Sequence, residues 1–285
     1  MYYGGSAVSK GAKARPNKSR LCDIFGLTLM VARFGLTVAI VLSCLRLSAQ
    51  APEDPQAEYN RGTDYWYGRG VPQDYVEAAN WFRKAAEQGY AEAQYRLGQM
   101  LAVGQGIAPD LAEAATWYRK AAEQGVVLAQ HNLGTMYVEG QGVKTDYAEA
   151  VKWFRKAGEQ GYAGSQHNLA VSYREGKGVA QDFHQAMAWF TKAADQGYAE
   201  SQFAIGLLHA DGQGVPQDLA EALPWFRKAA DQGFVPAEFN MGVMYEAGMG
   251  GLARDLDQAR GWYSKAAESG LPQAQEALAR LRPSK

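Results

Sequence analysis

Histidine is the side chain in this sequence best suited to metal binding or acid–base chemistry near neutral pH. The chain contains four, His131, His167, His184 and His209. His131 and His167 hold the same phase of adjacent 36-residue units. Equivalent helices in neighbouring units would lie about 10 Å apart, too far for two imidazoles to share one metal without distortion. Aromatic residues hold this phase elsewhere: Tyr59, Tyr95, Phe203 and Phe239. The pattern therefore predicts a half-buried aromatic slot, with no metal and no cofactor.

Other catalytic patterns are missing from the repeated part of the sequence. A serine β-lactamase or penicillin-binding protein needs a Ser-x-x-Lys motif, which the repeats lack. The Gly-x-Gly units follow predicted helices instead of opening one after a strand, so they do not fit a nucleotide-binding loop. We therefore predict no catalytic residues and no enzymatic activity.

Acidic residues recur in pairs that resemble catalytic dyads but are better explained by helix capping. An Asp is followed three residues later by Glu or Gln, the pattern of a capping box in which each side chain bonds the other residue's backbone N–H. The Asp positions are 74, 110, 146, 182, 218 and 255. Six helices are thus predicted to begin at these points.

Tryptophan sets the period of the chain. Trp81, Trp117, Trp153, Trp189 and Trp225 recur every 36 residues, and Trp262 follows after 37. In each unit a first helix carries a buried face such as Ala93, Leu97 and Leu101, a Gly-x-Gly turn ends it, and the Asp-capped helix follows. A period of this length is typical of a solenoid.

We expect an all-α solenoid of six helix-pair repeats. Their ranges are 55–90, 91–126, 127–162, 163–198, 199–234 and 235–271, with a capping helix at 272–281. Residues 52–285 would form this single repeat domain, after an N-terminal segment at 1–51. The polar Arg61 replaces the apolar core residue of the other units (Leu, Ile or Met), as expected of a terminal repeat that faces water.

Three phrases of the repeat carry a resemblance to a known family. They are Ala-Glu-Ala-Gln-Tyr-x-Leu-Gly, Gly-x-Gly-Val-x-x-Asp and Ala-x-x-Trp-Phe-x-Lys-Ala-Ala-Glu-Gln-Gly. The sequence closely resembles the Sel-1-like repeat, a relative of the tetratricopeptide repeat. The resemblance implies a right-handed superhelix of antiparallel helix pairs that serves as a scaffold for protein complexes. A cysteine-rich branch of the family is linked to β-lactams, but its paired cysteines are absent here.

A protein partner would bind the concave surface of such an array, lined by the first helices. One exposed phase of these helices is rich in Asn, and another, seven residues on, is acidic in the third to fifth units. The predicted partner-binding residues are Asn60, Trp66, Tyr67, Arg96, Asn132, Glu139, Asn168, Glu175, Asp211 and Asn240. Asn both donates and accepts hydrogen bonds, so it can meet a partner's backbone. Alternatively, the Asn residues order the helix pairs or simply face water.

Trp66 stands outside the phase of the other tryptophans. Ala102, Val138, Arg174, Ala210 and Glu246 hold its place in the later repeats. Two interpretations remain open: Trp66 seals the N-terminal end of the array, or it is an exposed aromatic that anchors a partner.

Charge and cysteine content restrict the partners. Residues 52–285 carry 22 Lys and Arg against 29 Asp and Glu, a net charge of −7. Because nucleic-acid affinity depends on neutralising phosphates with cations, nucleic acid is not an expected partner. The cysteines, Cys22 and Cys44, both lie in the N-terminal segment. The repeat domain therefore has no thiol chemistry, which is compatible with an oxidising compartment.

The N-terminal segment has the anatomy of an export signal. From Met30 there is a short basic region, an apolar run and a small-residue cleavage motif near Ala49. Translation would then start at Met30 or, with a long basic extension, at Met1. We expect export to the periplasm or beyond. Alternatives are an uncleaved inner-membrane anchor at 34–45 and lipidation at Cys44.

Together these patterns predict an exported protein-interaction scaffold that binds a partner protein or peptide. The alternative is an envelope enzyme or binding protein that acts on peptidoglycan or β-lactams.

Overall fold

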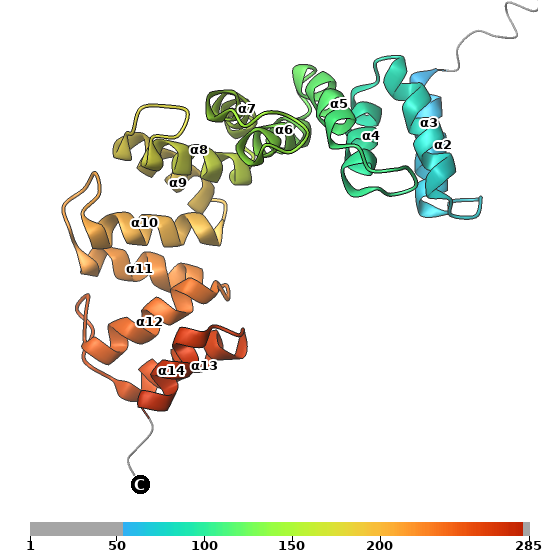
Figure 1. Ribbon diagram of the computed structural model, residues 1–285. Coiled ribbons are helices and arrows are strands. Elements are labelled where there is room, and N and C mark those ends of the chain that lie inside the picture. The colour runs from blue at the N-terminus through green and yellow to red at the C-terminus, as the bar shows by residue number, and fades with distance from the viewer. Residues whose placement is uncertain (1–53, 282–285) are drawn as a thin grey trace, which may run out of the picture. The chain divides into compact units, whose positions relative to one another are not determined.

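The computed structural model describes residues 54–281 as consecutive helices, and this range contains no strand. The helices are α2 (Pro55–Tyr67), α3 (Tyr75–Glu87), α4 (Ala91–Val103), α5 (Leu111–Glu123), α6 (Val127–Glu139), α7 (Tyr147–Glu159), α8 (Ala163–Glu175), α9 (Phe183–Ala194), α10 (Ala199–Asp211), α11 (Leu219–Ala230), α12 (Val235–Ala247), α13 (Leu256–Glu268) and α14 (Pro272–Arg280). Each helix packs against the next along the chain, which confirms the predicted solenoid of helix pairs (Figure 1). The predicted signal segment at 1–51, with Cys22 and Cys44, lies outside the described residues.

The first helix of each pair buries the face predicted for it. Ala93 and Leu97 are fully buried and Leu101 is 1% exposed. In five of the six repeats a glycine on this helix meets the aromatic residue that follows the Trp of the second helix, and the fourth repeat has Ala170 there. At Gly134, an added Cβ would lie 2.6 Å from the Phe154 ring, so glycine lets the two helices approach closely. Phe154 is therefore more deeply buried than its neighbour Trp153, at 2% against 7% exposure.

The capping prediction is half right. In all six second helices the Asp side chain accepts backbone N–H groups of the first turn, as when Asp110 accepts from Glu113 at 2.9 Å. The reciprocal bond predicted from Glu or Gln is wrong. The Asp N–H instead donates to a carbonyl of the preceding helix, as from Asp110 to Leu101 at 3.0 Å. The Glu side chain is thereby released for other contacts.

The second glycine of each Gly-x-Gly turn has a role between repeats. Gly142 has φ 67°, and a Cβ added there would overlap the carbonyl of Leu111, at the start of α5 in the preceding repeat. The turn thus ends one helix and also presses against the neighbouring unit. Such close approach needs both the left-handed backbone and the missing side chain of glycine.

A glutamine ladder links the repeats through their interior. Gln130 on α6 donates to the Ala122 carbonyl of the preceding repeat at 3.0 Å and accepts from Gln160 of its own repeat at 2.8 Å. The same arrangement recurs at Gln94, Gln166 and Gln202. Because a buried amide must have its hydrogen bonds satisfied, this ladder specifies how consecutive repeats are joined.

Candidate functional site

A pocket of about 260 Å³ lies between α6 and α8, two successive first helices. Its apolar lining comprises Val138, Val171, Tyr147 and Phe154. Val138 is 36% exposed and Tyr147 is 39% exposed, so this lining includes two of the large apolar residues that face solvent in the described range. Phe154 belongs to the core, where it packs against Gly134. The pocket, called the α6–α8 pocket below, can therefore accept an apolar side chain.

Three of the predicted partner-binding residues line this pocket: Glu139, Asn168 and Glu175. Glu139 and Glu175 are the last residues of α6 and α8, so stacking of the repeats places both at the same edge. Glu175 pairs with Lys177 at 2.8 Å and with Arg174 at 3.1 Å. The Lys177 hydrogen bond, followed by that from Arg174, holds the pKa of Glu175 below its usual range. Glu139 makes no ion pair within residues 54–281, so its carboxylate remains available to a partner cation.

The other predicted residues are placed apart from this pocket. Asn60, Tyr67 and Asp211 are exposed on α2 and α10, whereas Arg96 and Asn240 are half-buried on α4 and α12. Arg96 donates to Gln99 at 3.1 Å, and Asn60 accepts from Gln56 at 3.1 Å. The Asn phase therefore does not form one uniform ladder, and in the fifth repeat it is interrupted by the buried Ala204.

Asn132 has a structural partner. The Asn132 side chain lies close enough to the hydroxyl groups of Tyr95 and Tyr118 to lower the pKa of both, against the larger raising effect of burial. Tyr118 is only 4% exposed, and burial raises its pKa to about 12. A hydroxyl in such surroundings needs a hydrogen-bond partner. At this position the alternative interpretation, an Asn that orders the helix pair, agrees with the geometry.

Trp66 is packed, not free. Its ring lies 5.0 Å from that of Tyr75 in an edge-to-face contact and 6.4 Å from that of Phe82. These residues form a small cluster in the first repeat, in agreement with the sealing interpretation. Its neighbour Tyr67 is 54% exposed and lies beneath the Arg69 guanidinium at 4.7 Å. Only Tyr67 therefore offers an exposed aromatic face here.

The histidine slot is a packing feature between repeats. The His131 ring lies 4.8 Å from Tyr162, and its Nδ1 is 2.9 Å from the Ser165 hydroxyl of the next repeat. His167 repeats the contact with Ser201, also at 2.9 Å. Burial lowers the pKa of both imidazoles, that of His167 to about 4. Both are therefore neutral near pH 7. No group of three or more His, Cys, Asp or Glu side chains within residues 54–281 is arranged to hold a metal ion.

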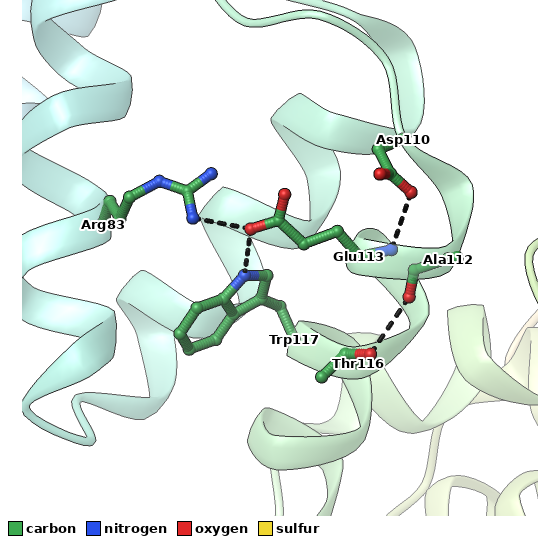
Figure 2. Close-up of polar contacts among 6 residues, drawn as sticks. All are labelled: Arg83, Asp110, Ala112, Glu113, Thr116 and Trp117. Atoms are coloured by element: carbon green, nitrogen blue, oxygen red, sulfur yellow. Dashed lines mark hydrogen bonds and ion pairs between the residues drawn. The ribbon is translucent and has the colours of Figure 1, made fainter.

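A carboxylate ties the first two repeats together. Glu113 Oε1 accepts from Arg83 of the preceding repeat at 2.6 Å and from the Trp117 indole N–H at 3.0 Å (Figure 2). These two donors, Arg83 first, hold the pKa of Glu113 below its usual range. Figure 2 also shows the Glu113 N–H donating to Asp110, so the backbone caps the helix while the side chain reaches the neighbouring unit.

Repeat length, helix pairing and the internal ladder define an α-solenoid repeat protein, and comparison with known proteins identifies its family. The Sel1 repeat profile matches residues 55–90, 91–126, 127–162, 163–198, 199–234 and 235–271, the boundaries predicted from the sequence. The chain belongs to the Sel1 repeat family.

Solved structures that share this fold include the following two. A protective antigen of uropathogenic Escherichia coli strains is 40% identical with a TM-score of 0.76; the match covers 84% of this chain and 51% of the antigen chain. A Sel1 repeat protein from Oxalobacter formigenes is 34% identical with a TM-score of 0.67, over 76% of this chain and 86% of that one. No curated protein sequence matches the chain. Sel1 repeat proteins are in general protein-interaction scaffolds.

The repeat pattern alone does not point to the apolar residues of the α6–α8 pocket. Val138 lies in the last turn of α6, and Tyr147 is the first residue of α7. Both side chains are exposed, so burial in the core does not explain why these positions hold large apolar residues. That mismatch between residue type and exposure was visible in the repeat alignment, where Arg174 and Glu246 hold the phase of Val138. Separately, no helix within residues 54–281 has the length and apolar character needed to cross a bilayer.

Proposed function

We propose that this protein is an exported scaffold that binds a partner protein through the α6–α8 pocket. The observation that carries the proposal is the meeting of Glu139, Asn168 and Glu175 around an apolar floor. An apolar side chain of the partner would enter between Val138 and Val171. A Lys or Arg beside it would approach Glu139, and Asn168 would hydrogen-bond the partner's backbone.

Export is proposed from the basic region, apolar run and cleavage motif of residues 30–51. An absence of thiols from residues 52–285 suits a protein that works outside the reducing cytoplasm. The scaffold role is supported by membership of the Sel1 repeat family.

A crosslinking pull-down from the envelope fraction tests the proposal. One bait is the unmodified chain, and the second carries Glu139→Ala, Asn168→Ala and Glu175→Ala. A matched control carries Asp211→Ala and Asn240→Ala, which alter the same phases outside the pocket. We expect one protein to be captured by the first and third baits and lost with the second. Equal capture by all three baits would refute the pocket, and no enrichment by any bait would refute the scaffold function.

A further inference from the structure

A second pocket, called the α7 pocket below, has a volume of about 490 Å³ and lies along α7 and the loop after α8. Its charged lining consists of Lys152, Arg155, Lys156 and a single carboxylate, Glu149. Three cations against one anion make this pocket positive, although residues 52–285 as a whole carry a net charge of −7. The local charge is thus opposite to that of the repeat domain and favours an anion.

Two of the three cations have neutral partners. Arg155 donates to the Tyr173 hydroxyl at 2.6 Å, and the Lys156 ammonium lies 4.1 Å from the centre of the Trp153 ring. Only Lys152 has an acidic partner, Glu149, at 2.5 Å. Lys152 and Lys156 are both exposed, so an incoming anion can approach them without displacing core side chains.

Trp153, which lines this pocket, has a buried indole N–H without a hydrogen-bond partner in the described structure. Trp153 is 7% exposed, and its Nε1 makes no hydrogen bond within the described residues. The equivalent Trp117 donates to the Glu113 carboxylate at 3.0 Å (Figure 2). A buried donor without a partner is costly, so the position held by a carboxylate oxygen in the second repeat is an acceptor site in the third.

Two differences between the second and third repeats accompany the loss of this bond. Lys152 occupies the phase that Thr116 holds in the second repeat, where the threonine hydroxyl bonds the Ala112 carbonyl and leaves Glu113 undisturbed. Glu149, the counterpart of Glu113, accepts from Lys152 instead, and Trp153 has no acceptor. In addition, Arg83 of the first repeat donates to Glu113 of the second. Its counterpart Arg119 donates to the Tyr137 hydroxyl instead, so it does not hold Glu149 in the equivalent place.

We propose that the α7 pocket binds a carboxylate of an acidic peptide segment, which takes the place at Trp153 that Glu113 takes at Trp117. One carboxylate oxygen displaces the atoms that cover the buried indole N–H and accepts from it, and the Lys152 and Lys156 ammonium groups neutralise its charge. Val151 and Val179, which also line the pocket, contact the methylene groups of the acidic side chain. This site is separate from the α6–α8 pocket and does not depend on the function proposed for it.

Binding of a fluorescein-labelled tetraglutamate peptide to the full chain, measured by fluorescence anisotropy at low ionic strength, tests the site. Tetraglutamine and tetralysine peptides are the charge controls. We expect Trp153→Phe to weaken tetraglutamate binding about tenfold, because it removes the N–H and keeps an aromatic ring. Lys152→Thr, which restores the residue of the second repeat, should weaken it at least as much, since it removes a cation and frees Glu149 to bond Trp153.

Glu149→Gln should act in the opposite direction and tighten binding several-fold, because it removes the competing carboxylate. The matched change Glu221→Gln, at the same phase outside the pocket, should leave binding unchanged. Tetraglutamate should also shift the Trp153 indole resonance of the ¹⁵N-labelled chain, which Trp153→Phe identifies among the signals of the seven tryptophans. The proposal would be overturned if the Trp153→Phe, Lys152→Thr and Glu149→Gln variants all bound tetraglutamate as tightly as the unmodified chain does. An unshifted Trp153 signal at saturating tetraglutamate would also overturn it.

Discussion

Single buried side chains decide how well neighbouring repeats are joined. Glu238 is the position of the glutamine ladder that joins its neighbour least well. It holds the phase of Gln94, Gln130, Gln166 and Gln202 but is a carboxylate. It is 6% exposed, its Oε2 has no hydrogen-bond partner in the described structure, and burial raises its pKa. The glutamines each donate to a carbonyl eight residues earlier, which an ionised Glu238 cannot do for Ala230.

Glu238→Gln should therefore stabilise the protein by about 1–3 kcal/mol at pH 7, by restoring a donor for the Ala230 carbonyl. Because the folded pKa of Glu238 is raised, the penalty grows as pH rises above the unfolded value near 4.5, so the gain should shrink toward pH 4. Urea unfolding at both pH values measures the effect. Glu92→Gln, the same change at an exposed site, is the control and should stay within about 0.5 kcal/mol. A destabilised Glu238→Gln variant would contradict this account.

The paired serines explain the histidine slots. Ser165 and Ser201 are fully buried and follow His131 and His167 by 34 residues. Where the slot holds an aromatic ring, as at Phe203, the residue 34 positions later is Ala237. At this repeat position a buried serine hydroxyl thus occurs, in the described residues, only where an imidazole nitrogen can satisfy it. This coupling can be found in the sequence once the repeats are aligned, but its reason requires the contact between repeats.

The His167 pair predicts loss of stability in acid. Burial lowers the folded pKa to about 4, so between pH 6.5 and 4 the unfolded chain binds a proton that the folded chain excludes. Stability should therefore fall with pH across this window, by up to about 3 kcal/mol for this residue. Nearby charges act in both directions, with Glu200 raising and Arg174 lowering the pKa of His167, and Tyr198 packs on the ring.

Urea unfolding between pH 7 and pH 4.5 measures this loss. The double variant His167→Phe with Ser201→Ala copies the natural Phe203–Ala237 arrangement and should reduce the pH dependence without creating an orphaned hydroxyl. An unchanged dependence in the double variant would assign the acid sensitivity to other groups.

At the scale of helices and turns, nearly all of the fold was predictable, because the sequence signals are local and repeated six times. Within each unit, the Asp that begins the second helix, the apolar face of each helix and the glycines that end the helices all indicate the same structure. What the sequence did not reveal are contacts between units: the glutamine ladder, the Arg83–Glu113–Trp117 contact and the use of Gly142 against Leu111. For the candidate site, the polar residues Glu139, Asn168 and Glu175 were identified from phase, whereas the pocket depends on how α6 packs beside α8.

Gly142→Ala should be among the most damaging small substitutions in a turn. Its positive φ alone costs about 1–2 kcal/mol for alanine, and the overlap with the Leu111 carbonyl adds to that cost. Gly161 also has a positive φ, 94°, but a Cβ there meets nothing within 4 Å. Gly161→Ala should therefore show the backbone cost alone. Thermal unfolding of both variants separates the two effects, and equal losses would show that the contact between repeats contributes nothing.

At the scale of the whole repeat domain, stability is expected to be a sum of repeats and of interfaces between neighbours. The described contacts support this view, since each helix packs mainly on the helices before and after it. The two ends of the described domain differ from its middle, where each repeat has a neighbour on both sides. Glu58 holds the buried Gln phase in the first repeat, before which the described residues contain no unit that requires a donor, and it accepts from Gln88 at 2.5 Å. At the other end α14 follows the last repeat and covers α13.

Removal of α14 should therefore loosen the domain from its C-terminal end without affecting its middle. Ala274 and Ala277 on α14 pack against Ala259, Tyr263 and Ala266, which would become exposed in a chain that ends at Leu271. We expect amide hydrogen exchange in α13 to accelerate at least tenfold, equivalent to about 1.4 kcal/mol, while α5 to α8 exchange at their original rates. A chain that ends at Leu281 keeps the helix and is the matched control. Uniform acceleration along residues 54–271 would instead show that the six repeats unfold as one cooperative unit, and the additive description would fail.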